Sequence, residues 1–305
     1  MPRPLRFYVL VLPNLPWPDL AARFQEVESL GFDTVGMADH FVDWANPASH
    51  WYELWTHVAA VAALTARIRI RTCVAQIPLR DPATLAKQAL AVDHISGGRL
   101  DLGIGIGLPI DPSYGMMGIA NWTNQERVAR LGEYLEVVDR VLSNEVSSYQ
   151  GRYYSIDGAV TSPLPIQRPR PPIMLAAMGP VMLKRTARYA DIWNSMSFAE
   201  DFEAQLAETR DRCEQIDRCC DAIGRDPATL VRSYHMFDPG SRASGGAIDY
   251  YASGDAFAER VRRVVELGIS DIGLYYPMLP GQHAAFERIA AETIPALRGE
   301  FTAVG

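Results

Sequence analysis

Residues 34–41 read Thr-Val-Gly-Met-Ala-Asp-His-Phe, a short apolar run that ends in an acid and an imidazole. The apolar part, Thr34–Ala38, predicts a β-strand buried on both faces. Asp39 and His40 follow where the strand ends, and Trp44 lies four residues beyond His40. In a barrel of alternating strands and helices, the carboxyl ends of the strands carry the chemistry. These three side chains are a poor choice for packing. They are a good choice for holding a planar cofactor and moving a proton or a hydride beside it.

The rest of the chain alternates strand-like and helix-like segments in the same way. Apolar runs of strand length are found at Leu5–Leu12, Thr34–Ala38, Ile68–Val74, Leu100–Ile104, Ile173–Ala176, Ile192–Met196, Leu230–Met236 and Ile272–Tyr276. Between them, helical periodicity is found at residues 19–30, 52–64, 82–95, 124–142, 181–189, 202–223, 256–267 and 283–297. Eight strands in this alternation predict an α/β fold in which residues 1–305 form a single (β/α)8 TIM barrel, rather than an open doubly wound sheet.

Three stretches are too long for ordinary βα turns, and we interpret them as insertions at the C-terminal mouth of the barrel. They are residues 108–123, residues 144–172 and residues 238–254. The second contains a predicted hairpin around Gly151, and the third is rich in glycine and is expected to be mobile. Long loops over a barrel mouth commonly act as lids.

Composition argues against several classes of function. The net charge of −7 argues against binding to nucleic acid, which requires a positively charged surface. No apolar run approaches the length that spans a membrane, and the start of the chain is too short and too interrupted by proline for a signal peptide. The four cysteines show no C-x-x-C pair and no histidine at metal spacing. We therefore expect buried thiols, no metal and a cytoplasmic protein.

A glycine-rich run at residues 97–107 is similar to a dinucleotide-binding loop, but its spacing is G-x-G-x-G. Leu108 and Pro109 follow it, where a helix would be needed to receive a pyrophosphate. Two interpretations remain. Either the strand end lets a flat ring approach the backbone at Gly105 and Gly107, or the run is a tight turn with structural glycines.

Two further strand ends have features of a ligand site. Across residues 71–82 the apolar pattern breaks before Pro82 can begin a helix, and a bulge there would press backbone against a ring. Residues 177–181 join a strand to a helix, and Pro180 has no amide hydrogen. The amides available as an anion site are those of Ala177, Met178, Gly179 and Val181. An ordinary βα turn is the alternative.

In chain order, these blocks resemble the luciferase-like flavin and deazaflavin oxidoreductase superfamily along nearly the whole sequence. The matching pieces are Glu28–Asp33, Ala38–His40, Thr72–Pro82, Ser96–Gly107, Pro171–Gly179 and Tyr189–Trp193. The resemblance implies a (β/α)8 barrel that binds a flavin-type ring at its C-terminal mouth. Residues 39–41 with Trp44 look most like the branch that uses 8-hydroxy-5-deazaflavin, coenzyme F420.

The resemblance also implies roles for individual residues. His40 and Trp44 match residues that line the site beside the ring, and His40 is expected to act as general acid or base or to orient the reacting group. Asp39 is expected either to accept from the polar edge of the ring or to fix the His40 tautomer. A non-proline cis peptide is implied at Cys73–Val74. The residues expected to bind the cofactor are Asp39, Cys73, Val74, Gln76, Gly105, Gly107, Ala177, Met178, Gly179 and Val181. A homodimer is expected from the family alone.

Two departures from the family argue against a sugar phosphate as substrate. Leu108 stands where the sugar-phosphate dehydrogenases of this branch have an acid, and no lysine follows Lys184. We therefore expect an F420-dependent oxidoreductase that moves a hydride between the cofactor C5 and another small organic substrate. The alternatives are a two-component monooxygenase that uses reduced FMN and oxygen, and a flavin-binding barrel without activity. Secondary candidates for the site are His50, Trp51, Glu53, Asp111, His235, Tyr275 and Tyr276.

Overall fold

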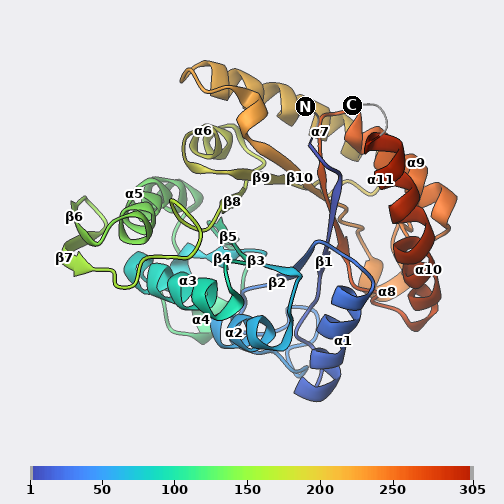
Figure 1. Ribbon diagram of the computed structural model, residues 1–305, viewed down its shortest axis with the longest axis horizontal. Coiled ribbons are helices and arrows are strands. Elements are labelled where there is room, and N and C mark those ends of the chain that lie inside the picture. The colour runs from blue at the N-terminus through green and yellow to red at the C-terminus, as the bar shows by residue number, and fades with distance from the viewer. Residues whose placement is uncertain (1–2, 303–305) are drawn as a thin grey trace. The chain divides into compact units, whose positions relative to one another are not determined.

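Strands and helices group into two compact units that interleave along the sequence. The computed structural model describes residues 3–302 (Figure 1). The C-terminal unit comprises the chain up to Val11, Glu26–Val35 and everything from Ala177 onward. The N-terminal unit comprises Leu12–Gln25 and Gly36–Ala176.

In the C-terminal unit, four parallel strands lie side by side. Their order is β1 (Arg6–Leu10), β11 (Asp271–Tyr275), β10 (Val231–His235) and β9 (Ile192–Ser195). Its longer helices are α6 (Pro180–Tyr189), α7 (Phe202–Asp221), α9 (Gly254–Val265) and α11 (Ile294–Thr302). Two shorter helices, α8 (Ser241–Ser244) and α10 (His283–Arg288), lie in the chain before and after β11. A π-helical turn (Ile289–Thr293) joins α10 to α11.

The N-terminal unit contains the remaining parallel strands. The order is β2 (Thr34–Met37), which enters this unit at Gly36, then β3 (Arg69–Thr72), β5 (Leu100–Gly105) and β8 (Ile173–Ala176). A short strand, β4 (Ala75–Gln76), pairs with the end of β5. Its helices are α2 (Leu54–Leu64), α3 (Pro82–Ser96), α4 (Ser113–Met116) and α5 (Asn124–Ser143), and α1 (Trp17–Ser29) runs from this unit into the other.

The helices begin where the sequence supplies a cap. Asp81 accepts hydrogen bonds from the amides of Ala83 and Thr84 at the start of α3, and Pro82 occupies the first helical position, where no amide hydrogen is needed. Gly97 ends α3 with a φ of 67°, the left-handed conformation that favours glycine. Such local signals explain why each of the eight predicted strands and eight predicted helices is found in the described residues.

The third predicted strand differs from the expectation of residues 68–74. β3 ends at Thr72, the chain resumes strand pairing only at β4, and the Cys73–Val74 peptide between them is cis. The predicted hairpin is confirmed as β6 (Val146–Gln150) and β7 (Ser155–Val160), which lie beside α5 in Figure 1.

The glycine-rich insertion at residues 238–254 is pinned by one buried carboxylate, although its composition suggested a mobile loop. Asp238 accepts hydrogen bonds from the amides of Ile248 and Asp249, at 3.0 and 2.8 Å. The Cβ of any other residue at Gly246 would lie 1.8 Å from the Asp238 carboxylate. Within the described residues, no helix combines the length and apolarity needed to cross a membrane.

His57 of α2 is buried among aromatic rings of the N-terminal unit. Its ring lies 5.1 Å from that of Phe24 and 5.9 Å from that of Trp17. Neither ring nitrogen has a hydrogen-bond partner within the described residues. Burial lowers the pKa of His57 to about 4, so the ring is neutral in the folded protein at neutral pH.

This burial predicts acid sensitivity. In the unfolded chain His57 is protonated below about pH 6.5, whereas in the folded protein it stays neutral down to about pH 4. Between these two pH values the unfolded state binds more protons, so the free energy of unfolding decreases as the pH falls. The loss between pH 7 and pH 5 is about 2 kcal/mol from this residue. We expect His57→Phe to flatten the pH dependence of urea unfolding by about that amount. The exposed His50→Gln serves as the control, and an unchanged pH dependence in His57→Phe would contradict the assignment.

Candidate active site

The Asp39 carboxylate ties the end of β2 to the chain beyond β4. It accepts a hydrogen bond from the Gln76 amide at 2.9 Å and from both terminal nitrogens of Arg80. Arg80 also pairs with Glu53, the residue that caps α2. Asp39 is 3% exposed and both of its oxygens are engaged. The expectation that Asp39 fixes the His40 tautomer is therefore wrong, because the carboxylate is already held by Arg80 and the β4 backbone.

Asp111 is the residue that orients His40. Its Oδ2 lies 2.9 Å from His40 Nδ1 and 2.8 Å from Gln76 Nε2. The Gln76 side-chain amide has two hydrogens, which its bonds to Asp111 and to the Asp39 carbonyl account for. The 3.1 Å contact between Gln76 Nε2 and His40 Nδ1 therefore contains no hydrogen from Gln76. We infer that His40 Nδ1 carries a proton and donates it to Asp111.

Asp111 is a carboxylate in this arrangement. Burial raises its pKa, but hydrogen bonds from His40, Ser113 and Gln76 outweigh burial and lower the pKa to about 2. The side chain is wholly buried. A fixed negative charge beside Nδ1 compensates the positive charge that forms when the opposite nitrogen of the ring takes a proton.

The opposite nitrogen, His40 Nε2, has no hydrogen-bond partner within the described residues, and the side chain is 26% exposed. The Trp44 ring lies 4.7 Å from the His40 ring, edge to face, and the Trp51 ring lies 5.8 Å away. The Trp51 indole N–H is buried and is also unpaired within the described residues. Within the part of the chain that the structure describes, His40 Nε2 is thus an unpaired acceptor beside the indoles of Trp44 and Trp51, and the Trp51 N–H is an unpaired donor.

A chain of hydrogen bonds extends from Asp111 into the protein. Gln76 Oε1 accepts from the Tyr114 hydroxyl at 2.5 Å, and that hydroxyl accepts from Arg127 at 3.1 Å. Arg127 is fully buried, and its guanidinium lies 4.5 Å from the centre of the Tyr114 ring. Arg127 also donates to the carbonyl oxygens of Ile106 and Trp122 and to the side-chain oxygen of Asn121. These hydrogen bonds fix the orientation of the Gln76 side-chain amide, because Oε1 faces Tyr114 and Nε2 therefore faces Asp111.

The Cys73–Val74 peptide is cis, as the resemblance implied. The Cys73 amide donates to the Met37 carbonyl at 2.7 Å, which holds the segment against the end of β2. Both side chains at this bulge are half-buried. The bulge therefore presents Cys73 and Val74 at the strand end, next in the chain to the buried Gln76.

The glycine run is explained by packing inside the N-terminal unit. A Cβ at Gly103 would lie 1.8 Å from the Thr72 carbonyl oxygen, and a Cβ at Gly105 would lie 2.3 Å from a Val74 methyl. At Gly107, where φ is 70°, it would lie 2.1 Å from the Tyr114 hydroxyl. The run makes room for the bulge after β3 and for the hydrogen-bond chain to Asp111. This packing accounts for structural glycines, and the approach of a flat ring to the backbone at Gly105 and Gly107 stays a prediction.

The C-terminal unit contains the other block expected to bind the cofactor. The Ala177 amide is already used, because it donates to the Asn194 carbonyl at 3.0 Å. α6 begins at Pro180 without a side-chain cap, and the amides of Met178, Gly179 and Val181 have no acceptor within the described residues. The predicted anion site at this helix N-terminus thus keeps three donors but loses the one expected from Ala177.

His235 belongs to a buried polar cluster of the C-terminal unit. Its Nδ1 lies 3.2 Å from the Tyr8 hydroxyl, which accepts a hydrogen bond from Asn194 at 3.0 Å. Burial lowers the pKa of His235 to about 3, so the ring is neutral. The Tyr275 ring packs edge to face against it at 4.6 Å. Because His235 Nε2 and the neighbouring Ser195 hydroxyl are buried without partners in the described residues, they remain available to a ligand.

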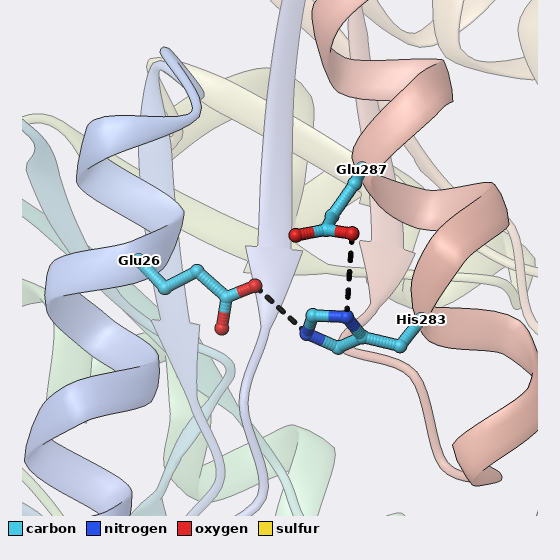
Figure 2. Close-up of side chains that lie close together, drawn as sticks. All are labelled: Glu26, His283 and Glu287. Carbon is cyan, nitrogen blue, oxygen red and sulfur yellow. Dashed lines mark ion pairs between the residues drawn. The ribbon is translucent and has the colours of Figure 1, made fainter.

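Tyr276, another secondary candidate, takes part in an ion-pair cluster that the sequence did not indicate. Figure 2 shows His283 between Glu26 of α1 and Glu287 of α10. His283 Nε2 lies 2.8 Å from Glu26, and Nδ1 lies 3.7 Å from Glu287. The Tyr276 hydroxyl donates to Glu26 at 2.7 Å. The imidazole thus faces a different carboxylate through each nitrogen.

Comparison with known proteins identifies the family. The sequence profile described as luciferase-like monooxygenase matches residues 7–239. The chain belongs to this family. Within it, the chain is similar to F420-dependent glucose-6-phosphate dehydrogenases from Kineococcus radiotolerans and Intrasporangium calvum, at 31% and 26% identity over 70% and 89% of this chain. The matches span 66% and 92% of those proteins. An F420-dependent hydroxymycolic acid dehydrogenase from Mycobacterium tuberculosis is 30% identical over 72% of this chain and 58% of its own length.

Solved structures confirm the fold. A structure of an F420-dependent secondary alcohol dehydrogenase in complex with an F420-acetone adduct matches 97% of this chain and 99% of its own with a TM-score of 0.82, at 18% identity. The monooxygenase RslO1 from Streptomyces bottropensis matches 96% of this chain and 99% of its own with a TM-score of 0.76, at 20% identity. This luciferase-like member therefore has the predicted (β/α)8 barrel fold. Deazaflavin enzymes and a monooxygenase share it, so the fold alone does not decide the cofactor.

The sequence missed Asp111 as the partner of His40. Asp111 is only a secondary candidate in the sequence, because nothing in a sequence measures the approach of two loops that are separated by α2, β3, β4, α3 and β5. The signal that could have found it is local. Asp111 stands directly before Pro112 and Ser113, where a carboxylate commonly caps a turn, and it does accept from the Ser113 amide at 2.8 Å.

This geometry predicts the protonation of His40. We expect long-range ¹H–¹⁵N NMR of wild-type protein to show the Nδ1–H tautomer of neutral His40. In Asp111→Asn, an amide cannot accept from His40, Gln76 and Ser113 together, so the tautomer preference should weaken. The loss of unfolding free energy should be about 1–3 kcal/mol.

The matched control is Asp43→Asn. Asp43 is a neighbouring buried carboxylate that accepts from the amides of Ala45 and Asn46. A dominant Nε2–H tautomer in the wild type, or the same tautomer change in both variants, would contradict the pairing of His40 with Asp111.

Proposed function

We propose that this chain is an F420-dependent oxidoreductase that moves a hydride between the deazaflavin and a small alcohol or carbonyl compound. The observation that carries the proposal is the His40–Asp111 pair, which leaves His40 Nε2 unbonded beside Trp44. Relatives named as F420-dependent dehydrogenases support the choice of cofactor.

The residues present fit a bound ring. The buried Trp51 N–H lacks a partner in the described residues, and the bulge in the same unit presents the half-buried side chains of Cys73 and Val74. In the C-terminal unit, the uncapped amides at the start of α6 suit an anionic group of a cofactor. We assign Cys73 and Val74 to the ring, and Met178, Gly179 and Val181 to an anionic group.

When bound, the deazaflavin supplies a carbon that accepts or donates a hydride. Oxidation of an alcohol removes a hydride from carbon and a proton from oxygen, so the protein must supply a base for the proton. His40 Nε2 takes that role, since Nδ1 is committed to Asp111. Asp111 stabilises the imidazolium that forms, and in the reverse direction the same nitrogen returns the proton to the carbonyl oxygen.

The relatives do not support excluding a sugar phosphate, because several of them are named as glucose-6-phosphate dehydrogenases. Glucose 6-phosphate is therefore one of the substrates to be tested. In this chain, Leu108 and the absence of lysine after Lys184 remain the arguments against it.

The proposal predicts selective cofactor binding. Titration of apo-protein should give saturable quenching of tryptophan fluorescence with F420 and weaker quenching with FMN, because Trp44 and Trp51 lie beside His40. Preference for FMN would contradict the proposal and favour oxygen-dependent monooxygenase chemistry. Binding of F420 with no turnover of any alcohol, ketone or sugar phosphate would favour a barrel without activity.

The proposal also predicts the effect of removing the base. We expect His40→Gln to lower kcat by roughly 10²- to 10⁴-fold while the dissociation constant for F420 changes little. The exposed His50→Gln, in the same loop, is the control. A kcat for His40→Gln within a few-fold of wild type would exclude His40 as the group that moves the proton.

A further inference from the structure

The loops that carry His40 and Asp111 also carry an unusual share of exposed apolar side chains. Thirteen large apolar residues are exposed within the described part of the chain, and six of them lie on residues 41–44 and 108–117. These six, which we term the apolar rim, are Phe41, Trp44, Leu108, Ile110, Met116 and Met117. Ile110 is 77% exposed and Phe41 is 53% exposed. Two short segments therefore hold nearly half of such residues, which marks a binding surface rather than scattered exposure.

Hydrogen bonds hold the two segments of the rim together. The Phe41 amide donates to the Ser113 hydroxyl at 2.9 Å, and the His40–Asp111 pair joins the same two loops at 2.9 Å. Asn121 closes the second loop on itself by donating to the Pro109 carbonyl at 2.9 Å. The rim is thus attached on both sides to the imidazole that we assign as the base.

The loops of the rim carry almost no charge. Residues 41–52 and 108–123 contain no lysine, arginine or glutamate. Their two aspartates, Asp43 and Asp111, are buried and hydrogen-bonded within the protein. A phosphate or carboxylate placed on this surface would find no cation on either loop. An uncharged apolar ligand would lose little by leaving water here.

We propose that the apolar rim binds the substrate, and that the substrate is an uncharged secondary alcohol or ketone with an extended hydrocarbon body. This inference rests on the proposed function for its reacting group. In the oxidative direction the carbinol C–H bond breaks, its hydride goes to the oxidised deazaflavin, the O–H proton goes to His40 Nε2, and the carbonyl double bond forms. The hydrocarbon body lies on Ile110 and Met116, and the oxygen lies at His40.

The test uses a series of 2-alkanones from 2-butanone to 2-octanone, with glucose 6-phosphate as the charged comparison. Binding of each ketone to the protein without cofactor is measured by calorimetry, and turnover is measured with reduced F420. We expect affinity and kcat/KM to rise with each methylene, by up to roughly four-fold where the group is fully buried. Ile110→Ser and Met116→Ser should flatten this dependence. Ile223→Ser, which changes an exposed residue of the other unit, should not.

The outcomes separate this inference from the proposed function. Turnover with F420 that ignores chain length, or that prefers glucose 6-phosphate, would overturn the apolar substrate and leave the oxidoreductase standing. Ketone binding that rises with chain length, in a protein that does not bind F420, would support the rim and overturn the proposed function. If Ile110→Ser dissociates a dimer in sedimentation velocity and ketones do not bind, the rim is an interface between copies of the chain and the inference is wrong.

Discussion

A carboxylate with no exposure to water must be compensated by the atoms around it, and in this protein Asp111 imposes that condition on three separate segments. The loop after β2 supplies His40, the β4 segment supplies Gln76, and the loop after β5 supplies the Ser113 amide. Oδ2 accepts from both His40 and Gln76, and Oδ1 accepts from the Ser113 amide, so loss of any one donor would leave the buried charge less well compensated. The loops of the N-terminal unit are therefore held at one place by one charge, and the imidazole is oriented as part of the same arrangement.

The irregular segment after β3 brings Gln76 to the position where it can donate to Asp111. β3 ends at Thr72, and after the cis peptide the chain returns to strand pairing at β4 with Gln76 buried. Gln76 then contacts both ends of the site, because its backbone amide serves Asp39 and its side chain serves Asp111. A regular strand would have no interruption between Thr72 and Gln76. The glycines of β5 provide the space that the interruption requires.

Much of this fold could be predicted from the sequence, because its signals are local. Apolar runs of strand length, an aspartate before Pro82 and a glycine after α3 place elements to within a few residues. Family resemblance placed the cis peptide at Cys73–Val74 and chose His40. The pairing of His40 with Asp111 could not be predicted, since it depends on where two loops meet. The same limit explains the role given to Asp39, whose true partner Arg80 lies beyond the next helix and strand. The burial of His57 against the rings of Phe24 and Trp17 is likewise a tertiary contact that the sequence of α2 does not show.

The close packing of the glycine run also bears on how this protein can diverge. A side chain at Gly103, Gly105 or Gly107 would collide with the Thr72 backbone, a Val74 methyl or buried polar side chains, respectively, so substitutions at these three positions are disfavoured. The rim residues at 108–117, a few positions further along the same segment, are exposed and contact little. A closely packed stretch thus continues directly into a stretch whose apolar side chains are exposed to solvent. If the proposed roles hold, substitutions in the second stretch would change the surface offered to a substrate, while the first stretch would keep His40 and Asp111 in place.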